Sequence, residues 1–104
     1  MKTVEFIGSS LDDVSAITIE VRRVVGHELW QVQNGPMPSD YRPMPVIGSG
    51  AHEIRVHLMG EWRVIYVAKF EDTVFVLHAF QKKTQAMRQQ DIEVARRRYR
   101  QIGK

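Results

Sequence analysis

Two arginines, two histidines and one phenylalanine share an alternating spacing in the second half of the chain: Arg55, His57, Arg63, His78 and Phe80. Guanidinium groups can bind a phosphate through paired hydrogen bonds and stabilise the extra negative charge of a pentacoordinate phosphorus. An imidazole can move a proton near neutral pH, and a phenyl ring can stack on an unpaired base. These side chains suffice for metal-free RNA cleavage, in which a base activates the ribose 2′-hydroxyl to attack the adjacent phosphate.

Three segments with β-strand character carry these residues, namely 53–58, 62–68 and 73–80. The first alternates polar and apolar residues, and the other two are rich in β-branched and aromatic residues. This pattern predicts a three-stranded antiparallel meander. A three-residue turn over 59–61 would place His57 opposite Arg63 and Arg55 opposite Ile65, because loop length sets cross-strand pairing. A two-residue turn at 71–72 would place Arg63 opposite Phe80 and Ile65 opposite His78.

These pairings sort the side chains of the sheet onto two faces. A two-residue first turn would instead place Arg63 among apolar residues without an evident partner, which is costly, so we expect the first register. The face with the five residues would also carry Ile65, Val67, Val74 and Val76. The opposite face would be apolar and open to helices, with Ile54, Val56, Leu58, Trp62, Val64, Tyr66, Ala68, Phe75, Leu77 and Ala79.

Each of the five residues also has a simpler structural interpretation. The arginines could pair with Glu53 or Glu61, each histidine could be a partly buried polar residue, and Phe80 could belong to the core. His52 and His57 would point to opposite faces of one strand, so we expect no zinc site there. The chain has no cysteine, which excludes disulfides, cysteine-based zinc clusters and a thiol nucleophile. We expect neither a metal nor a cofactor.

The remaining segments predict the elements that hold this sheet. Residues 3–7 indicate a strand, Ser10 can cap a short helix that runs to about Ala16, and an amphipathic helix begins at Thr18 and ends before Asn34-Gly35-Pro36. Residues 34–50 contain all four prolines and predict an extended loop laid across the sheet. Residues 88–102 indicate a C-terminal helix. We therefore expect a single α+β domain over 1–104: an N-terminal helical hairpin and a C-terminal helix on an antiparallel sheet of one N-terminal strand plus the meander.

The charge is unevenly distributed along the chain. Residues 1–81 carry seven basic and ten acidic side chains, a net charge of −3, whereas residues 82–104 carry eight basic and two acidic ones, a net charge of +6. A basic segment on a mildly acidic body indicates a phosphate-rich or acidic partner, although a solvated charged helix would look the same. The N-terminal apolar run is too short for a signal sequence and no stretch is long enough for a membrane helix, so we expect a cytoplasmic protein without a membrane partner.

Several motifs spread over nearly the whole chain carry a family likeness. The sequence resembles the phage-derived branch of the RelE/HigB toxins. This resemblance implies the RelE-like fold, cleavage of mRNA on the ribosome, and neutralisation by a helix-turn-helix antitoxin. The motifs are Ser10-Leu-Asp-Asp13, Arg42-Pro-Met-Pro45, Ile47-Gly48, Glu53-Ile-Arg-Val56, Trp62-Arg-Val-Ile-Tyr66, His78-Ala-Phe-Gln-Lys-Lys-Thr84 and Asp91-Ile followed by Ala95-Arg-Arg-Arg-Tyr99.

The resemblance also assigns roles. Arg55, Arg63 and Lys82 match basic positions of the family and would hold and neutralise phosphate. Some relatives place a catalytic tyrosine shortly after the last strand, where this chain has Arg88, so the proton-transferring group would be His78, His57 or a residue that the sequence does not identify. The expected RNA contacts are His57, Phe80, Lys83, Arg88, Arg96, Arg97 and Arg100.

Two other functions remain open at this point. Some branches of the superfamily act on DNA gyrase, so the chain could be a non-catalytic gyrase inhibitor. It could also be a phage-derived interaction module without toxicity. The leading hypothesis is a metal-independent mRNA endonuclease, which the resemblance implies to be ribosome-dependent and the toxin of a type II toxin–antitoxin system.

Overall fold

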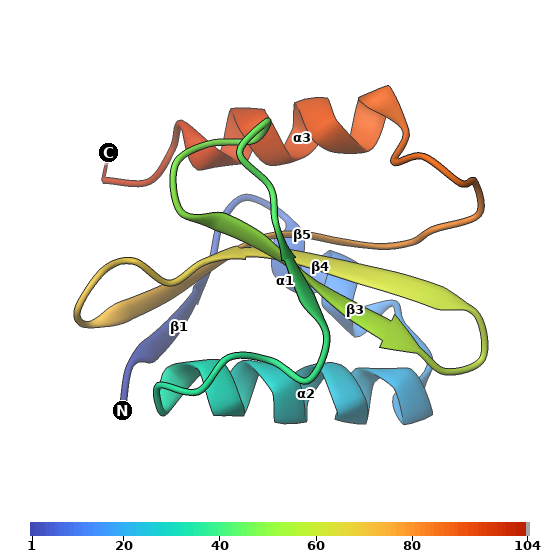
Figure 1. Cartoon of the computed structure of the whole chain (residues 1–104), viewed down its shortest axis with the longest axis horizontal. Coiled ribbons are helices and arrows are strands. Elements are labelled where there is room, and N and C mark those ends of the chain that lie inside the picture. Colours follow the sequence, from blue (N-terminus) through green and yellow to red (C-terminus); the bar gives the residue numbers. More distant parts are fainter. Residues whose placement is uncertain (104) are drawn as a thin grey trace.

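The computed structural model describes residues 1–103 and has three layers, with a central sheet between helices (Figure 1). Helix α2 covers one face of the sheet and helix α3 covers the other. No helix in the described residues is long and apolar enough to cross a membrane. In chain order the elements are β1 (Thr3–Phe6), α1 (Ser10–Ser15), α2 (Ile19–Gln33), β2 (Tyr41–Pro43), β3 (Ala51–His57), β4 (Glu61–Val67), β5 (Thr73–Gln81) and α3 (Gln89–Tyr99).

The sheet has five strands in the order β1-β5-β4-β3-β2. The predicted meander of β3, β4 and β5 is confirmed, but β1 pairs with β5 in parallel, so the sheet is mixed and not antiparallel throughout. The prediction that 34–50 lacks regular structure is wrong for Tyr41–Pro43, which pairs with β3. A strand that contains proline is tolerated there because β2 is an edge strand, where only one side must form ladder hydrogen bonds.

The turn between β3 and β4 differs from the expected one. Arg55 lies opposite Arg63, and His57 lies opposite Glu61, so the predicted pairing of His57 with Arg63 is wrong. The loop consists of residues 58–60, in which Met59 and Gly60 both have positive φ angles, 55° and 115°. The observed pairing of β3 with β4 differs from the predicted pairing by two residues, and successive side chains of a strand alternate between faces with a period of two. Every residue of β3 and β4 therefore stays on its predicted face.

The pairing of β4 with β5 is as predicted at one end and altered at the other. Arg63 lies opposite Phe80 and Ile65 opposite His78, which confirms both pairs, but the register shifts between Ile65 and Tyr66. This β-bulge inserts one extra residue and moves the rest of β5 to the opposite face. The predicted faces are therefore wrong for four residues: Val74 and Val76 join the core on the α2 side, whereas Phe75 and Leu77 join the one on the α3 side.

Both faces of the sheet are covered by hydrophobic cores. The α2-side core contains one apolar face of α2 packed on the sheet: Val21, Val25, Leu29 and Val32 with Ile54, Val56, Val64 and Tyr66. The α3-side core contains Ile7, Ile47, Ile65, Val67, Leu77 and Ala95. The face expected to be open to RNA is thus largely closed by α3. A groove remains near Arg55.

Candidate active site

A groove of about 400 Å³ lies between the segment that follows β2, strand β3, the chain after β5 and the first turn of α3. Four charged side chains line it, of which Arg42, Arg55 and Lys82 are basic and Glu53 is acidic. Its other walls are mostly apolar: Pro43, Met44, Pro45, Val46, Ala86, Met87 and Ile92. A hollow of this kind, with a few converging charges on apolar walls, is the usual form of a binding site.

Strand pairing brings these charges together. Alternation along β3 places Glu53 and Arg55 on the α3 side, and the edge strand β2 places Arg42 directly opposite Glu53. The backbone N–H of Lys82 donates to the carbonyl of Glu61 at 2.7 Å, which ties the chain after β5 to the edge of β4. Residues from three distant parts of the sequence therefore meet in one groove.

The two strand arginines converge on one carboxylate. The Nε atom of Arg55 lies 3.9 Å from Oε1 of Glu53, and the Nε atom of Arg63 lies 3.8 Å from the same oxygen. Both Nε atoms are buried without a hydrogen-bond partner. The side chain of Arg55 is 34% exposed and lines the groove, whereas that of Arg63 is 3% exposed and lies beneath it. Only Arg55 of this pair is accessible to a phosphate in this structure.

Glu53 is a residue that sequence reasoning treated only as a salt-bridge partner. It is 4% exposed, yet its side chain contributes to the floor of the groove. Burial raises the pKa of its carboxyl above the ordinary value of 4.5. Four neighbouring cations act in the opposite direction and offset this effect only in part: Arg63, Arg55, Arg42 and Lys82. A carboxylate with a raised pKa, held among cations, is suited to accept a proton from a substrate.

His57 lies on the exposed hairpin edge and outside the groove. Its Nε2 atom is 2.6 Å from Oδ2 of Asp40, and its Nδ1 atom is 2.8 Å from Oε1 of Glu61. These hydrogen bonds favour the charged imidazolium and raise the pKa of His57 above 6.5. The geometry therefore makes His57 a link between the β2 segment and the β3–β4 hairpin.

His78, which the sequence suggested as the base, is buried away from the groove. It is 9% exposed and lies between two carboxylates, with Nε2 2.8 Å from Asp91 and Nδ1 3.3 Å from Asp13. Its ring stacks on Phe80, with the ring centroids 4.9 Å apart. Phe80 itself packs against the α3-side core. The structure therefore gives His78 and Phe80 contacts that hold α3 on the sheet.

The basic C-terminal segment is divided between structural and exposed residues. Arg98 is buried, and its guanidinium donates to Asp13 at 2.8 Å, to Ser9 at 2.7 Å and to the carbonyl of Leu77 at 2.8 Å. Arg88 is exposed and donates to Asp91 at 3.1 Å. The remaining basic residues expected to contact RNA are exposed, namely Lys83, Arg96, Arg97 and Arg100.

Within residues 1–103, no group of three or more histidine, aspartate or glutamate side chains is placed to hold a metal ion. Arg42 and Glu53 are the charged groove residues to which the sequence assigned no role in binding or catalysis. Arg42 gave no signal because the prolines beside it obscured the edge strand. Glu53 could have been found from its i, i+2 spacing to Arg55.

Residues 12–100 match the family described as Phage derived protein Gp49-like (DUF891). The chain belongs to this family. The expected resemblance is thereby confirmed, because this phage-derived Gp49-like family is a RelE/HigB-like toxin family. A comparison with curated protein sequences finds no significant match.

Among solved structures, the Gp49-like chain is similar to a mutant of the E. coli toxin RelE in the free state. The TM-score is 0.68, the match covers 97% of each chain, and the two sequences are 17% identical. This likeness confirms the predicted RelE-like α+β fold. At such low identity it shows the fold alone.

Proposed function

We propose that this Gp49-like protein is the toxin of a type II toxin–antitoxin system and cleaves mRNA on the ribosome without a metal ion. One observation supports the proposal above all: three cations and one buried carboxylate converge in a groove on a RelE-like fold. The cations can supply the charge neutralisation that a phosphorane-like transition state requires. The carboxylate can supply the proton transfer.

In this proposal Arg42, Arg55 and Lys82 bind the scissile phosphate, since all three line the groove. Arg63 takes a different part from the direct phosphate contact that the sequence suggested. Its buried guanidinium lies against Glu53 and donates to Glu61 at 3.2 Å, so it positions the carboxylate. Glu53 replaces the two histidines as the proposed base, because neither His57 nor His78 lines the groove.

The proposed reaction is an internal transesterification. Glu53 removes the proton from the ribose 2′-hydroxyl while the ribose 2′-oxygen attacks the adjacent phosphorus. The bond between phosphorus and the 5′-oxygen breaks, and that oxygen takes a proton from the ammonium group of Lys82. The products are a 2′,3′-cyclic phosphate and a 5′-hydroxyl end. Exchange of protons with water then restores both side chains.

The exposed basic residues of the C-terminal segment extend the RNA-binding surface beyond the groove: Lys83, Arg88, Arg96, Arg97 and Arg100. We expect them to contact ribosomal RNA or the mRNA backbone, because phosphate contacts by arginine and lysine dominate sequence-independent affinity. His57 stays a prediction as an RNA contact at the hairpin edge, while Phe80 would need to leave its contacts in the core to stack on a base. A helix-turn-helix antitoxin is the expected protein partner.

The test uses the purified chain, ribosomes and a defined mRNA, with primer extension to map cuts and end analysis to detect the cyclic phosphate. We expect cuts only when ribosomes are present, and about a hundredfold loss in Arg55→Ala. Arg23→Ala is the matched control, because Arg23 is exposed on α2, on the opposite face of the sheet from the groove. Intact mRNA at saturating protein, with growth arrest and a DNA damage response in cells, would instead favour gyrase inhibition.

A further inference from the structure

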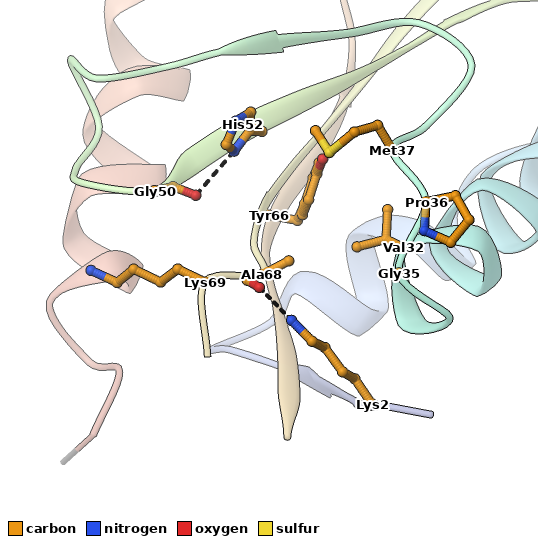
Figure 2. Close-up of a pocket in the computed structure, with 10 residues that line it drawn as sticks. All are labelled: Lys2, Val32, Gly35, Pro36, Met37, Gly50, His52, Tyr66, Ala68 and Lys69. Carbon is orange, nitrogen blue, oxygen red and sulfur yellow. Dashed lines mark hydrogen bonds between the residues drawn. The ribbon is translucent and has the colours of Figure 1, made fainter. Parts of the chain in front are cut away.

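A second hollow lies on the α2 side of the sheet, and the proposed cleavage reaction does not use it. Its volume is about 190 Å³, and Figure 2 shows the residues around it. A cavity of about 150 Å³ with apolar walls is enough to hold a benzene ring, so this one can hold one aromatic side chain. The lining residues come from the chain start, the end of α2 and the ends of β3 and β4: Lys2, Val32, Gly35, Pro36, Met37, Gly50, His52, Tyr66, Ala68 and Lys69.

The hydroxyl of Tyr66 is the unsatisfied polar group of this pocket. Tyr66 is 1% exposed, and its hydroxyl has no hydrogen-bond partner. In Figure 2 the hydroxyl points toward the side of the pocket on which Met37 lies. Burial raises the pKa of Tyr66 well above its ordinary value, so the group stays protonated and can donate a hydrogen bond. Buried polar groups without partners are rare and costly, which indicates that an acceptor arrives from outside.

The charge beside the pocket favours an acidic occupant. Lys2 and Lys69 are its charged lining residues, and no acidic side chain lines it among the residues that the structure describes. The ammonium of Lys69 points away from the pocket and donates to the hydroxyl of Tyr99 at 3.2 Å, so Lys2 is the cation that an occupant would meet (Figure 2). The Nζ atom of Lys2 donates to the carbonyl of Ala68, which keeps this ammonium beside the pocket (Figure 2). His52 stacks on Tyr66, with ring centroids 5.8 Å apart, and bonds through Nδ1 to the carbonyl of Gly50.

The surface beside the pocket is apolar and exposed. Met37 is 45% exposed and Tyr41, whose ring centroid lies 6.0 Å from that of His52, is 41% exposed. Large exposed apolar side chains next to a pocket are typical of a protein interaction surface, in which one anchoring side chain enters the pocket and its neighbours cover the rim. A small metabolite would leave this rim uncovered.

We propose that this pocket binds one ring-sized side chain that ends in a hydrogen-bond acceptor, such as tyrosine, from an acidic segment of a partner polypeptide. The anchor's oxygen would accept a hydrogen bond from Tyr66, and a flanking carboxylate would lie near the ammonium of Lys2. The pocket shares no lining residue with the active-site groove, and His52 and Glu53 point to opposite faces of β3. The inference therefore stands independently of RNA cleavage.

The test measures binding of blocked tripeptides to the full chain by amide chemical shifts of Gly35, Gly50 and Tyr66. The probe is acetyl-Glu-Tyr-Glu-amide, and its matched peptides replace the central tyrosine by phenylalanine or alanine, or both glutamates by lysine. We expect the phenylalanine peptide to bind about fivefold more weakly, because it leaves the Tyr66 hydroxyl unpaired. The alanine and lysine peptides should be weaker still.

Two variants complete the test. In Tyr66→Phe the preference for the tyrosine peptide should disappear, without loss of thermal stability, because an unpaired buried hydroxyl contributes nothing to folding. In Ala68→Leu the larger side chain should fill the pocket and abolish binding of both aromatic peptides. The proposal is overturned if no peptide shifts these amides, if the preference persists in Tyr66→Phe, or if free p-cresol binds as tightly as the tripeptide, which would indicate a small-molecule site.

Discussion

Replacing Glu53 by glutamine should separate the stability of the fold from the chemistry of the groove. Glutamine keeps the shape of the side chain and removes its charge. The raised pKa of Glu53 means that the folded protein holds the proton more tightly than the unfolded chain does. Stability from this group is therefore gained as the pH falls toward and below 4.5 and is lost as the pH rises through the folded pKa. At pH 7 the ionised carboxylate is unfavourable, so Glu53→Gln should unfold at the same temperature as wild type or higher.

Activity should change in the opposite direction. Loss of a general base lowers cleavage on the order of 10²- to 10⁴-fold, or about 3–5 kcal/mol in the barrier. Affinity for RNA should rise, because a phosphate bound beside the arginines would no longer be repelled by a carboxylate. At a separation of about 6 Å and an effective dielectric of about 40 this repulsion is roughly 1.4 kcal/mol, which corresponds to about tenfold tighter binding.

The assay combines single-turnover cleavage on ribosomes, binding of a non-cleavable 2′-deoxy substrate and thermal unfolding, each between pH 5 and pH 9. Wild-type cleavage should fall at acidic pH as Glu53 takes up a proton, and this acidic limb should be missing in Glu53→Gln. Glu5→Gln serves as the control, because Glu5 is exposed on the edge strand β1 and does not line the groove. Cleavage by Glu53→Gln within tenfold of wild type, with the acidic limb intact, would refute the assignment of the base.

Three other substitutions have distinct expected outcomes. Arg55→Ala should raise the cleavage barrier by about 3 kcal/mol and flatten the salt dependence of RNA binding, with an unchanged circular dichroism spectrum. His57 has a raised pKa, so the stability that it contributes is full below pH 6.5 and is lost as the pH rises through its folded pKa; chemical denaturation should show this loss in wild type and not in His57→Gln. His78→Ala removes one hydrogen bond each from Asp13 and Asp91, which keep Arg98 and Arg88 as partners, and should lower the free energy of unfolding by about 2 kcal/mol, while the folded fraction keeps its activity per molecule; an inactive but stable variant would return His78 to the catalytic residues.

Local pattern was sufficient to predict most of the elements of this protein. Apolar residues at helical spacing marked α2 and α3, and period-two alternation marked the three meander strands, because both patterns arise from burying one face of an element. The pairing of Arg63 with Phe80 followed from the turn expected at 71–72. The prediction that Arg55 and Arg63 share a face was also correct, although the predicted register was wrong by two residues, because a shift of two residues keeps each side chain on the same face.

The sequence could not reveal contacts that depend on long-range packing. The bulge beside Tyr66 places the side chains of residues 74–77 on the opposite faces of the sheet from those predicted, and no local signal marks where a strand will accommodate an extra residue. The burial of His78 depends on Asp13 and Asp91, which lie 65 and 13 residues away along the chain.

The residue types, the helices and strands and the family were therefore determined by the sequence, through composition and periodicity. Tertiary structure alone decided which charges face solvent. It placed α3 over His78 and left four charged side chains around one groove, namely Glu53, Arg42, Arg55 and Lys82. The physical reason is that the protonation and accessibility of an ionisable group depend on the surrounding side chains and water, and only the folded chain brings these surroundings together.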